Sequence, residues 1–519
     1  MHCRIFPGVI ENTIGKSIRE RRSCVNILLV YPACPQSYWS FHYALKFIRK
    51  KATYPPLGLV TIAAMLPDTW HKRLVDMNVS RLRDSDIIWA DYVCISAMDI
   101  QRQSANEVIA RCRALGTKTV AGGPLFTCGY DQFPDVTHIL CGEGELTIPA
   151  FLADIAAGHP RRLYTAEGWA DLRRTPVPLW NLIDIKKYAS MNIQYSRGCP
   201  YDCEFCSVTT LFGHTPRCKS ADQICAELTA LYEAGWRGSV FFVDDNFIGN
   251  KRRLKEEILP ALIRWMEEKR HPFSFSTEAS INLADDAELM AQMVRAGFTM
   301  VFIGIETTNE ESLIECNKMQ NKGRDLLNSV KGIQAAGLEV QGGFIVGFDN
   351  DNASVFGNII DFIQTSGIVS AMVGLLNAPK GTRLYQRLIR EKRLVNDSTG
   401  DNTDLTINFI PKMDRGRLLA GYRHIIDTIY SPREYCQRVM GFLREYRPPR
   451  SRLNTIRISY IAAALRSMVR LGIFAKGRRY YWRAVLWSLF RQPRLLPYAI
   501  KYAIYGYHYH KIYKDHIPG

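Results

Sequence analysis

Residues 192–206 read NIQYSRGCPYDCEFC, an expected buried strand that runs directly into three closely spaced cysteines. Cys199, Cys203 and Cys206 fall within eight residues, and an aromatic residue, Phe205, precedes the last thiol. Three thiols this close can form one disulfide with a thiol left over, hold a metal, or be small buried residues. The sequence around the loop is needed to decide among these possibilities.

Short apolar segments recur at helix-length intervals from this point onward. The expected strands are 192–198, 239–246, 273–279, 300–306, 339–348 and 371–378. Six βα units predict a partial (βα)6 TIM-type barrel over residues 188–400, with its active site at the carboxyl ends of the strands. The cysteine loop follows the first strand, which is where such a barrel carries its chemistry.

A second alternating series precedes the barrel. Expected strands at 25–33, 72–78, 91–98, 118–124 and 138–145 are rich in Val, Ile or Leu, and residues 104–116 have a helical period that ends on a glycine. They predict a doubly wound, Rossmann-like α/β domain over residues 24–158, with its ligand beyond the carboxyl ends of the strands. Residues 1–23 are read as an N-terminal tail and 159–187 as a linker.

The distribution of cysteines and of apolar residues indicates the cellular compartment of the protein. The 519-residue chain has 14 cysteines spread from Cys3 to Cys436, and only the group at 199–206 is tightly spaced. This distribution is typical of reduced thiols rather than of a disulfide framework. The apolar run near the N-terminus is short and reads as a first strand, and no stretch is long enough to span a membrane. We therefore expect a cytoplasmic protein.

The last part of the chain is helical in period and strongly basic. Residues 401–450 predict a helical region, and residues 451–519 carry thirteen Lys and Arg against one acid, Asp515, a net charge of +12. One apolar helix face is expected to carry Ile458, Ile461, Leu465, Met468 and Val469, with Arg466 and Arg470 on the opposite side. The tail is either a helical cap on the barrel or a peripheral contact with an anionic membrane on its inner face. Nucleic acid binding is a third, disfavoured reading.

The spacing of the cysteines leaves two kinds of metal site open. A C-x3-C-x2-C loop brings three thiolates close enough to bind three irons of a four-iron four-sulfur cluster, with the fourth iron open. His214 or Cys218 can instead supply a fourth ligand and close a tetrahedral zinc site. The spacing alone does not separate these alternatives.

Placed at the mouth of a six-strand partial barrel, the loop resembles the signature of the radical S-adenosylmethionine (radical SAM) superfamily. The resemblance implies a [4Fe–4S] cluster on Cys199, Cys203 and Cys206, whose open iron is chelated by S-adenosylmethionine. One electron, supplied by a partner such as flavodoxin or ferredoxin, then cleaves the sulfonium to a 5′-deoxyadenosyl radical that removes a hydrogen atom from an unactivated carbon.

The later strand ends also resemble the family's cofactor-binding motifs. The residues so matched are Asp244, Asp245 and Asn246 for the methionine amino group, Ser276 and Glu278 for the ribose, Glu306 for the ribose or a neighbouring arginine, and Gly343, Ile345, Gly347 and Phe205 for the adenine. A solvated turn is the alternative for the carboxylates after the second strand. Plain packing is the alternative for Phe205.

The first domain resembles the cobalamin-binding domains that are fused to radical SAM barrels. The matching segments are 53–59, 96–103, 121–124 and 142–145. The resemblance implies that cobalamin is bound by Ser96, Gly122, Gly123, Gly142 and Glu143. The Asp-x-His-x-x-Gly motif that supplies an axial histidine is missing, so bound cobalamin is expected without a protein nitrogen on cobalt. The alternative is a domain that keeps the fold and has lost the ligand.

The domain order, together with RGSVFFVDDNFIGNK at 237–251 and GDNTDLTINFIPKM at 400–413, resembles the cobalamin-dependent radical SAM group that includes the hopanoid C-2 methylases, with a C-terminal region of the DUF4070 type. The resemblance implies methylation of an unactivated carbon in an apolar small molecule or lipid. A radical rearrangement or cyclisation without net methyl transfer is the enzymatic alternative. A non-catalytic cluster and corrinoid sensor is the other alternative.

Overall fold

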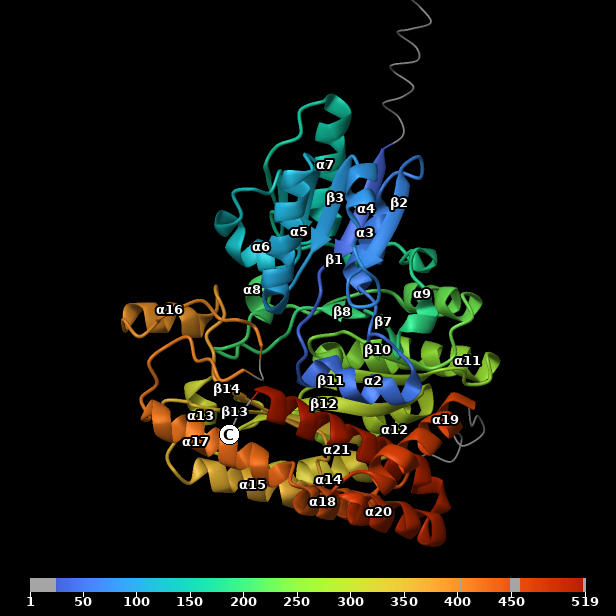
Figure 1. Ribbon diagram of the computed structural model, residues 1–519, viewed down its shortest axis with the longest axis vertical. Coiled ribbons are helices and arrows are strands. Elements are labelled where there is room, and N and C mark those ends of the chain that lie inside the picture. Colours follow the sequence, from blue (N-terminus) through green and yellow to red (C-terminus); the bar gives the residue numbers. More distant parts are fainter. Residues whose placement is uncertain (1–24, 402–403, 449–457, 517–519) are drawn as a thin grey trace, which may run out of the picture. The chain divides into compact units, whose positions relative to one another are not determined.

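A computed structural model describes residues 25–401, 404–448 and 458–516. These residues form two compact units (Figure 1). The first contains residues 25–33, 56–170 and 178–183, and the second contains residues 34–55, 171–177 and the remainder from 184 onward. Within the described ranges, no helix is both long enough and apolar enough to cross a membrane.

The first unit is a doubly wound parallel sheet, as predicted. Its strands are ordered β2-β1-β3-β4-β5-β6, with Val30 of β1 beside Ile95 of β3. Its elements are β1 (Asn26–Tyr31), α3 (Leu57–Met65), β2 (His71–Asp76), α4 (Asp84–Trp89), β3 (Tyr92–Ser96), α5 (Arg102–Ala114), β4 (Lys118–Gly122), α6 (Pro124–Gly129), β5 (His138–Cys141), α7 (Gly144–Ala157) and β6 (Leu163–Thr165).

Both faces of this sheet are covered, which explains why its strands read as continuous apolar runs. Side chains of α4, α5 and α6, among them Ile87, Val108 and Leu125, pack on one face. Leu59 of α3 and Phe151 of α7 pack on the other. The carboxyl ends of the strands are therefore the free edge for a ligand.

Two boundaries differ from the sequence prediction. Residues 163–165, assigned to a linker, form the edge strand β6 beside β5, and a strand of three residues is too short to show a period. Residues 34–55, assigned to the first domain, belong to the second unit. The backbone N–H of Ala189 donates to Ala52 O at 3.0 Å, and that of Ser190 to Thr53 O at 2.9 Å.

The second unit contains the predicted partial barrel, with six parallel strands ordered β14-β13-β12-β11-β10-β7. Its strands are β7 (Ser190–Ile193), β10 (Ser239–Phe242), β11 (Ser274–Ala279), β12 (Phe298–Glu306), β13 (Glu339–Val346) and β14 (Ala371–Leu375). The intervening helices are α8 (Val208–Phe212), α9 (Ala221–Glu233), α10 (Lys251–Arg253), α11 (Leu259–Glu268), α12 (Ala287–Ala296), α13 (Glu310–Glu315), α14 (Leu326–Ala335) and α15 (Val355–Ser366). A two-stranded ladder, β8 (Ser196–Arg197) with β9 (Arg217–Cys218), brackets the cysteine loop.

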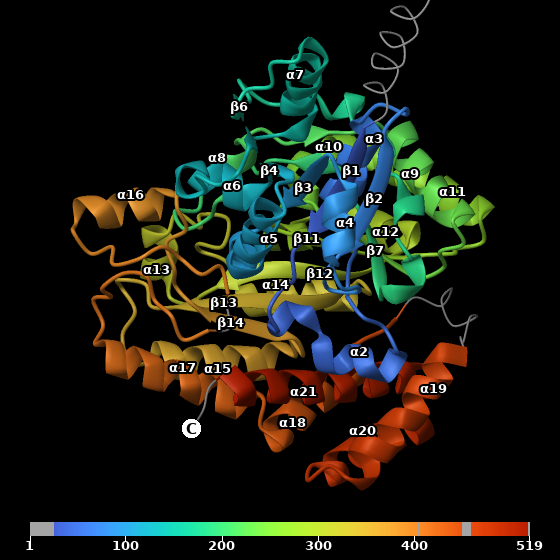
Figure 2. The same cartoon turned by 45° about the horizontal axis from the view of Figure 1, so that its top comes forward.

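The C-terminal part of the chain is helical, as predicted. Its helices are α16 (Arg383–Arg390), α17 (Arg415–Ile429), α18 (Pro432–Glu445), α19 (Ile458–Ser467), α20 (Arg478–Arg491) and α21 (Leu496–His516), with a π-helical segment at Met468–Ile473 after α19. α19 and α21 pack with the early helix α2 (His42–Ile48), which lies against α21 in both views (Figure 2), and α20 packs on α21. A buried apolar cluster joins these helices through Phe47, Ala463, Tyr481 and Ile504. The helices of the basic tail thus form a packed cap.

Residues 34–55 and α21 together cover the side of the barrel that the sheet leaves open. At one edge, Ala52 forms a parallel bridge with Tyr188, just before β7. At the other edge, Tyr509 of α21 donates from its hydroxyl to Ser370 Oγ at 3.0 Å, just before β14. The ring of Tyr38 stacks on Tyr509 with 4.5 Å between centroids, which joins the two covering segments.

Replacement of the buried Tyr509 by Ala should destabilise the protein strongly. Its side chain is 0% exposed, so Tyr509→Ala leaves a cavity and should lower the free energy of unfolding by about 3–5 kcal/mol. Tyr460→Ala is the matched control, because Tyr460 of α19 is 55% exposed and its loss should cost less than about 0.5 kcal/mol. Urea unfolding of the full chain measures both, and equal effects would contradict this role of α21.

Candidate active site at the carboxyl ends of the strands

Backbone pairing and a backbone hydrogen bond hold the cysteine loop in place around its first thiol. Ser196 pairs with Cys218 across the β8–β9 ladder, and the backbone N–H of Cys199 donates to Gly213 O at 3.3 Å. Gly198 has a φ of 93°, and a Cβ atom there would lie 2.8 Å from Thr215 O. Glycine is therefore required immediately before the first ligand.

The thiols of Cys199, Cys203 and Cys206 are free and partly buried. Burial raises the pKa of all three, that of Cys206 to about 12, and the ammonium of Lys318 opposes this rise. Across the described ranges, no group of three or more His, Cys, Asp and Glu side chains is placed to hold a metal ion. The donor set of three thiols on one loop fits a [4Fe–4S] cluster, in which each thiolate binds its own iron.

Asp244 and Asp245 follow β10 side by side but face different partners. The Asp244 carboxylate accepts hydrogen bonds from the backbone N–H groups of Tyr195 and Ser196, and from Ser196 Oγ at 2.6 Å. Burial raises the pKa of Asp245 to about 6, and its Oδ2 atom is buried without a hydrogen-bond partner. Asp244 therefore positions the segment before the cysteine loop, and Asp245 is left as the acceptor for a ligand.

Asn246 and Gln320 bring amide groups to the thiols. Asn246 Nδ2 lies 4.0 Å from Cys199 Sγ, and its Oδ1 accepts from the backbone N–H of Ser280 at 3.2 Å. Gln320 Nε2 lies 3.8 Å from Cys203 Sγ. Such donors stabilise thiolate charge. Sequence reasoning found Asn246 but missed Gln320, which lies in the connection between α13 and α14 and has no local pattern.

The partner of Glu306 is a lysine rather than an arginine. Lys318 Nζ lies 2.7 Å from Glu306 Oε1, and both side chains are largely buried. Burial alone would lower the pKa of Lys318, but the charges of Glu306 and Cys203 raise it above its ordinary value. The ammonium therefore stays charged beside the cysteine loop, and no sequence signal links residues twelve positions apart in this way.

Ser276 and Glu278 lie on β11, at alternate positions on the same face. Ser276 is buried. Burial, with the nearby charges of Asp245 and Asp244, raises the pKa of Glu278 to about 8. The Glu278 carboxyl group is thus mainly protonated at neutral pH and is able to donate a hydrogen bond.

The glycine-rich strand β13 pairs with β12 at a position where both strands carry a glycine. Gly343 is in register with Gly304, and a Cβ atom on Gly343 would lie 2.8 Å from the ring of Phe302. Gly347 follows the strand with a φ of 108°. Ile345 is half-buried on the same face as Gly343. Glycine is therefore required at 343 to make room for the Phe302 ring, and the contact of this strand with an adenine stays a prediction.

Phe205 lies between the second and third thiols. Its ring centroid is 6.2 Å from that of Phe348, which follows the end of β13. The aromatic residue of the cysteine loop and the predicted adenine-contacting strand are therefore neighbours, and the role of Phe205 over an adenine stays a prediction.

Two aromatic residues from the covering segment reach the barrel strands, and sequence reasoning missed both. The ring of Trp39 lies 5.2 Å from Phe302 of β12. The ring of Tyr54 lies 5.2 Å from Phe241 of β10. Phe241 and Phe302 alternate with fully buried residues that face the helices, so their rings face the barrel interior.

In the first unit, the residues proposed for cobalamin gather at one edge of the sheet. Ser96 ends β3 and Gly122 ends β4. Gly123 has a φ of 93°, and a Cβ atom there would lie 3.0 Å from Ala97 O and from Ser96 Oγ. Gly142 has a φ of 92° and directly follows β5. Glycine is required at the turns of Gly123 and Gly142, which lie at the carboxyl edge where a doubly wound sheet binds its ligand.

Glu143 directly follows the glycine turn after β5, and its contact with cobalamin stays a prediction. Its carboxylate is buried and accepts a hydrogen bond from the backbone N–H of Ala170 at 2.7 Å. It therefore holds the chain after β6 in place beside the glycine edge.

The histidines of the first unit lie away from this edge. His71 and His138 are the first residues of β2 and β5, so they stand at the amino ends of the strands. His159 follows the end of α7. Among the described residues of this unit, no histidine lies at the carboxyl edge, in agreement with the missing sequence motif.

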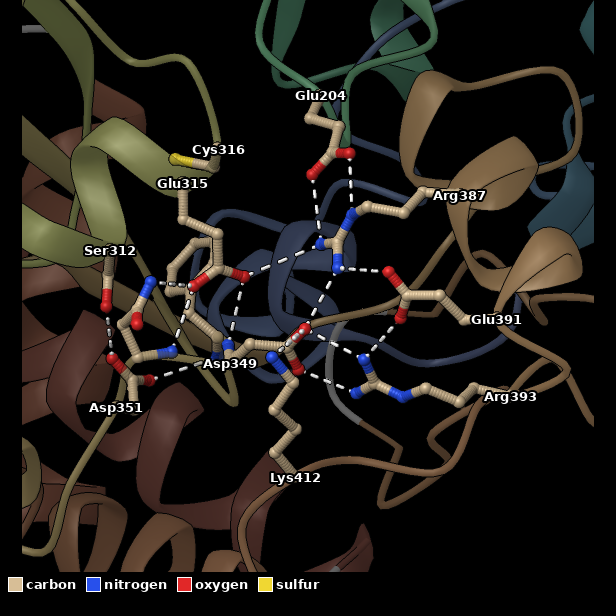
Figure 3. Close-up of polar contacts among 12 residues, drawn as sticks. Glu204, Ser312, Glu315, Cys316, Asp349, Asp351, Arg387, Glu391, Arg393 and Lys412 are labelled. Atoms are coloured by element: carbon tan, nitrogen blue, oxygen red, sulfur yellow. Dashed lines mark hydrogen bonds and ion pairs between the residues drawn. The ribbon is translucent and has the colours of Figure 1, made fainter.

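An arginine connects the cysteine loop to three other segments (Figure 3). Arg387 of α16 makes paired contacts with the Glu204 carboxylate, at 2.8 and 3.0 Å. It also donates to Asp349 at 2.9 Å and lies 3.5 Å from Glu315 of α13. The C-terminal helical region therefore holds the loop between Cys203 and Phe205 through one guanidinium.

Arg387→Met should loosen the cysteine loop. It leaves the carboxylate of Glu204 without its main partner, at a cost of about 2 kcal/mol, below the roughly 3–5 kcal/mol of a fully buried pair. Arg390→Met, on the exposed side of the same helix, is the matched control. We expect faster loss of iron to a chelator from reconstituted Arg387→Met than from wild type or Arg390→Met. Equal rates would show that Arg387 does not hold the loop.

Comparisons with known proteins agree with this geometry. Family models match the B12 binding domain at residues 48–152, the radical SAM superfamily at 193–363 and DUF4070, a domain of unknown function, at 382–518. A solved structure titled as the cobalamin-dependent S-adenosylmethionine radical enzyme OxsB, with aqua-cobalamin and S-adenosylmethionine bound, is similar in fold. Its TM-score is 0.59 at 14% identity, over 96% of this chain and 81% of that chain.

Two relatives are similar along most of the chain. The chain is 41% identical over 414 residues to an uncharacterized methyltransferase of Synechocystis sp. (strain ATCC 27184 / PCC 6803 / Kazusa), which covers 79% of this chain and 77% of that protein. It is 35% identical over 417 residues to the hopanoid C-2 methylase of Rhodopseudomonas palustris (strain TIE-1), over 79% of this chain and 78% of that protein. The chain therefore belongs to the family of cobalamin-dependent radical SAM enzymes that includes the hopanoid C-2 methylase.

Proposed function

We propose that the protein is a cobalamin-dependent radical SAM methylase that acts on an unactivated carbon of an apolar small molecule or lipid. The observation that carries the proposal is the three-thiol loop at the carboxyl end of the first barrel strand, in one chain with a glycine-edged B12-binding unit. When bound, the cluster and S-adenosylmethionine supply the radical that removes a hydrogen atom, and cobalamin supplies the methyl group.

The protein's own residues would bind and orient these groups. Cys199, Cys203 and Cys206 would hold the cluster. Asp245 would accept from the amino group of S-adenosylmethionine, because its Oδ2 atom is otherwise buried without a partner. The largely protonated Glu278 would donate to the ribose.

Aromatic side chains would shape the substrate side of the barrel. Trp39 and Tyr54 add apolar rings to those of Phe302 and Phe241. An apolar substrate suits such a wall, because transfer of apolar surface from water to these rings is favourable.

Three further proposals concern partners. A one-electron reductant such as flavodoxin or ferredoxin would supply the electron, since radical SAM chemistry needs one. The substrate would be a small molecule or a lipid. The basic C-terminal tail would make a peripheral contact with the inner face of the membrane, which its excess of Lys and Arg supports.

Replacing any one of the three loop cysteines by Ala should abolish cleavage of S-adenosylmethionine. Iron content and the formation of methionine and 5′-deoxyadenosine by the anaerobically reconstituted protein measure this. Cys225→Ala is the matched control, because Cys225 is a partly buried thiol on α9 outside the site. Cleavage by a variant that lacks all three cysteines would overturn the assignment. Cleavage without a methylated product would favour rearrangement or cyclisation.

Bound cobalamin should carry no protein nitrogen on its cobalt. The reason is the position of the histidines of the first unit at the amino ends of its strands or beyond. Electron paramagnetic resonance of the Co(II) form reports this, because a nitrogen ligand splits the signal into triplets. Triplets, or a failure to take up any corrinoid, would count against the B12 site.

A further inference from the structure

The helices of the basic tail leave a row of apolar side chains exposed along α19 and the segment after it, and α20 exposes Leu486, Leu489 and Phe490 as well. Ile461, Leu465, Val469, Ile473 and Phe474 follow one another at helical spacing along α19 and the π-helical segment, and each is between 50% and 77% exposed. We name these five residues the apolar ridge. Exposed apolar side chains that gather in one row mark an interaction surface rather than a random scatter.

A groove of about 420 Å³ runs beside the ridge, between α2 and α19. Phe47, Leu465 and Val469 form its apolar lining, and its charged lining residues are Lys46, Arg466 and Arg470. The sequence pattern predicts Arg466 and Arg470 opposite the apolar face, but the structure places both in the same groove as Leu465 and Val469. The groove therefore combines apolar surface with three cations and no acid.

Two of the groove's three cations are held in place by hydrogen bonds. The guanidinium of Arg466 donates to Phe47 O. Arg470 Nε donates to the hydroxyl of Tyr507 at 3.1 Å, and its guanidinium lies 5.1 Å from the centre of that ring. Below them is the buried cluster that joins α2, α19, α20 and α21. Little ordering is therefore needed when an anion binds here.

We propose that the apolar ridge and this groove dock the protein on the surface of an anionic lipid bilayer. The ridge enters the boundary between headgroups and acyl chains, and Lys46, Arg466 and Arg470 lie at the lipid phosphates. The inference rests on the proposed peripheral contact of the tail, and it does not depend on methyl transfer.

Charge and shape favour this occupant over two others. Between residues 458 and 516 there are eleven Lys and Arg against one acid, Asp515, which accepts from the hydroxyl of Tyr43. A second copy of the chain would bring the same positive charge to the contact. A single-stranded nucleic acid stacks on aromatic rings, whereas four of the five ridge residues are aliphatic. An anionic bilayer satisfies both the charge and the apolar row.

The docking surface is part of the same segment that covers the barrel. Lys46 and Phe47 belong to α2, and the chain before α2 carries Trp39, whose ring meets Phe302 of β12. A lipid substrate taken from the bilayer would therefore meet the segment that forms one side of the barrel.

The test uses full-length protein and sedimentation with vesicles. At low salt, wild type should sediment with vesicles of phosphatidylglycerol and phosphatidylcholine and stay in solution with phosphatidylcholine alone. High salt should release it, because the Debye length shortens. The double variant Leu465→Glu with Phe474→Glu should lose at least about tenfold in vesicle association, since it buries charge in place of apolar surface. The matched control is Ile88→Glu with Val395→Glu, at exposed apolar positions elsewhere.

A second pair of variants tests the cations. Lys46→Gln with Arg470→Gln should weaken association about 30-fold, at about fivefold for each cation. Arg113→Gln with Arg252→Gln removes two exposed cations elsewhere and should change little. Matching thermal midpoints establish that the variants are folded.

The proposal is overturned if wild type stays in solution with anionic vesicles at low salt, or if the ridge variant binds as well as wild type. Equal sedimentation with neutral vesicles would also overturn it. If sedimentation velocity shows self-association that the ridge variant abolishes, without vesicle binding, the ridge is a contact between copies. Cleavage of S-adenosylmethionine in solution should keep the wild-type rate in every variant, so a failed docking test leaves the proposed reaction standing.

Discussion

A six-stranded parallel sheet that stops short of closing leaves a free backbone edge on each side, and those edges must be covered. Here the chain covers them with its own distant parts. Residues 51–53 run beside the segment that enters β7. Tyrosine hydroxyls reach β14 at the other edge, where Tyr430 donates to Ala371 O at 2.6 Å and Tyr422 to Val373 O at 3.3 Å. The tyrosine content of the C-terminal helices follows from this requirement, since a tyrosine fills an apolar gap and still satisfies a backbone acceptor.

The electrostatics of the barrel mouth follow from its excess of buried acids. Burial raises the pKa of Asp244 to about 7, that of Asp245 to about 6 and that of Glu278 to about 8. The ammonium of Lys318 forms an ion pair with Glu306. A cationic ligand offsets the cost of ionising the two aspartates, and both a sulfonium and an α-amino group carry positive charge. Ligand binding and proton release are therefore coupled at this site.

The two sheets could be predicted from the sequence because their strands are continuous apolar runs separated by helix-length segments. The cysteine loop could be predicted because its ligands are close in sequence. Lys318 and Arg387 could not, because each meets its partner only through the fold: Lys318 returns to Glu306 after α13, and Arg387 reaches Glu204 from the C-terminal region. The segment 34–55 was assigned to the first unit because it follows that unit's first strand, and its pairing with residues near 188 has no local pattern. The individual cofactor contacts stay predictions.

The covering of the barrel also has a consequence for biosynthesis. Residues 34–55 are synthesised long before their partner helix α21. Contacts between residues so far apart in sequence form late, because the intervening chain must be ordered before these contacts can stabilise the fold. During translation the lateral edges of the sheet therefore remain uncovered, and the first unit has its β1 strand attached to a segment with no partner. A premature stop anywhere before α21 would release a chain whose barrel cannot complete its wall, a class of product that is prone to aggregation.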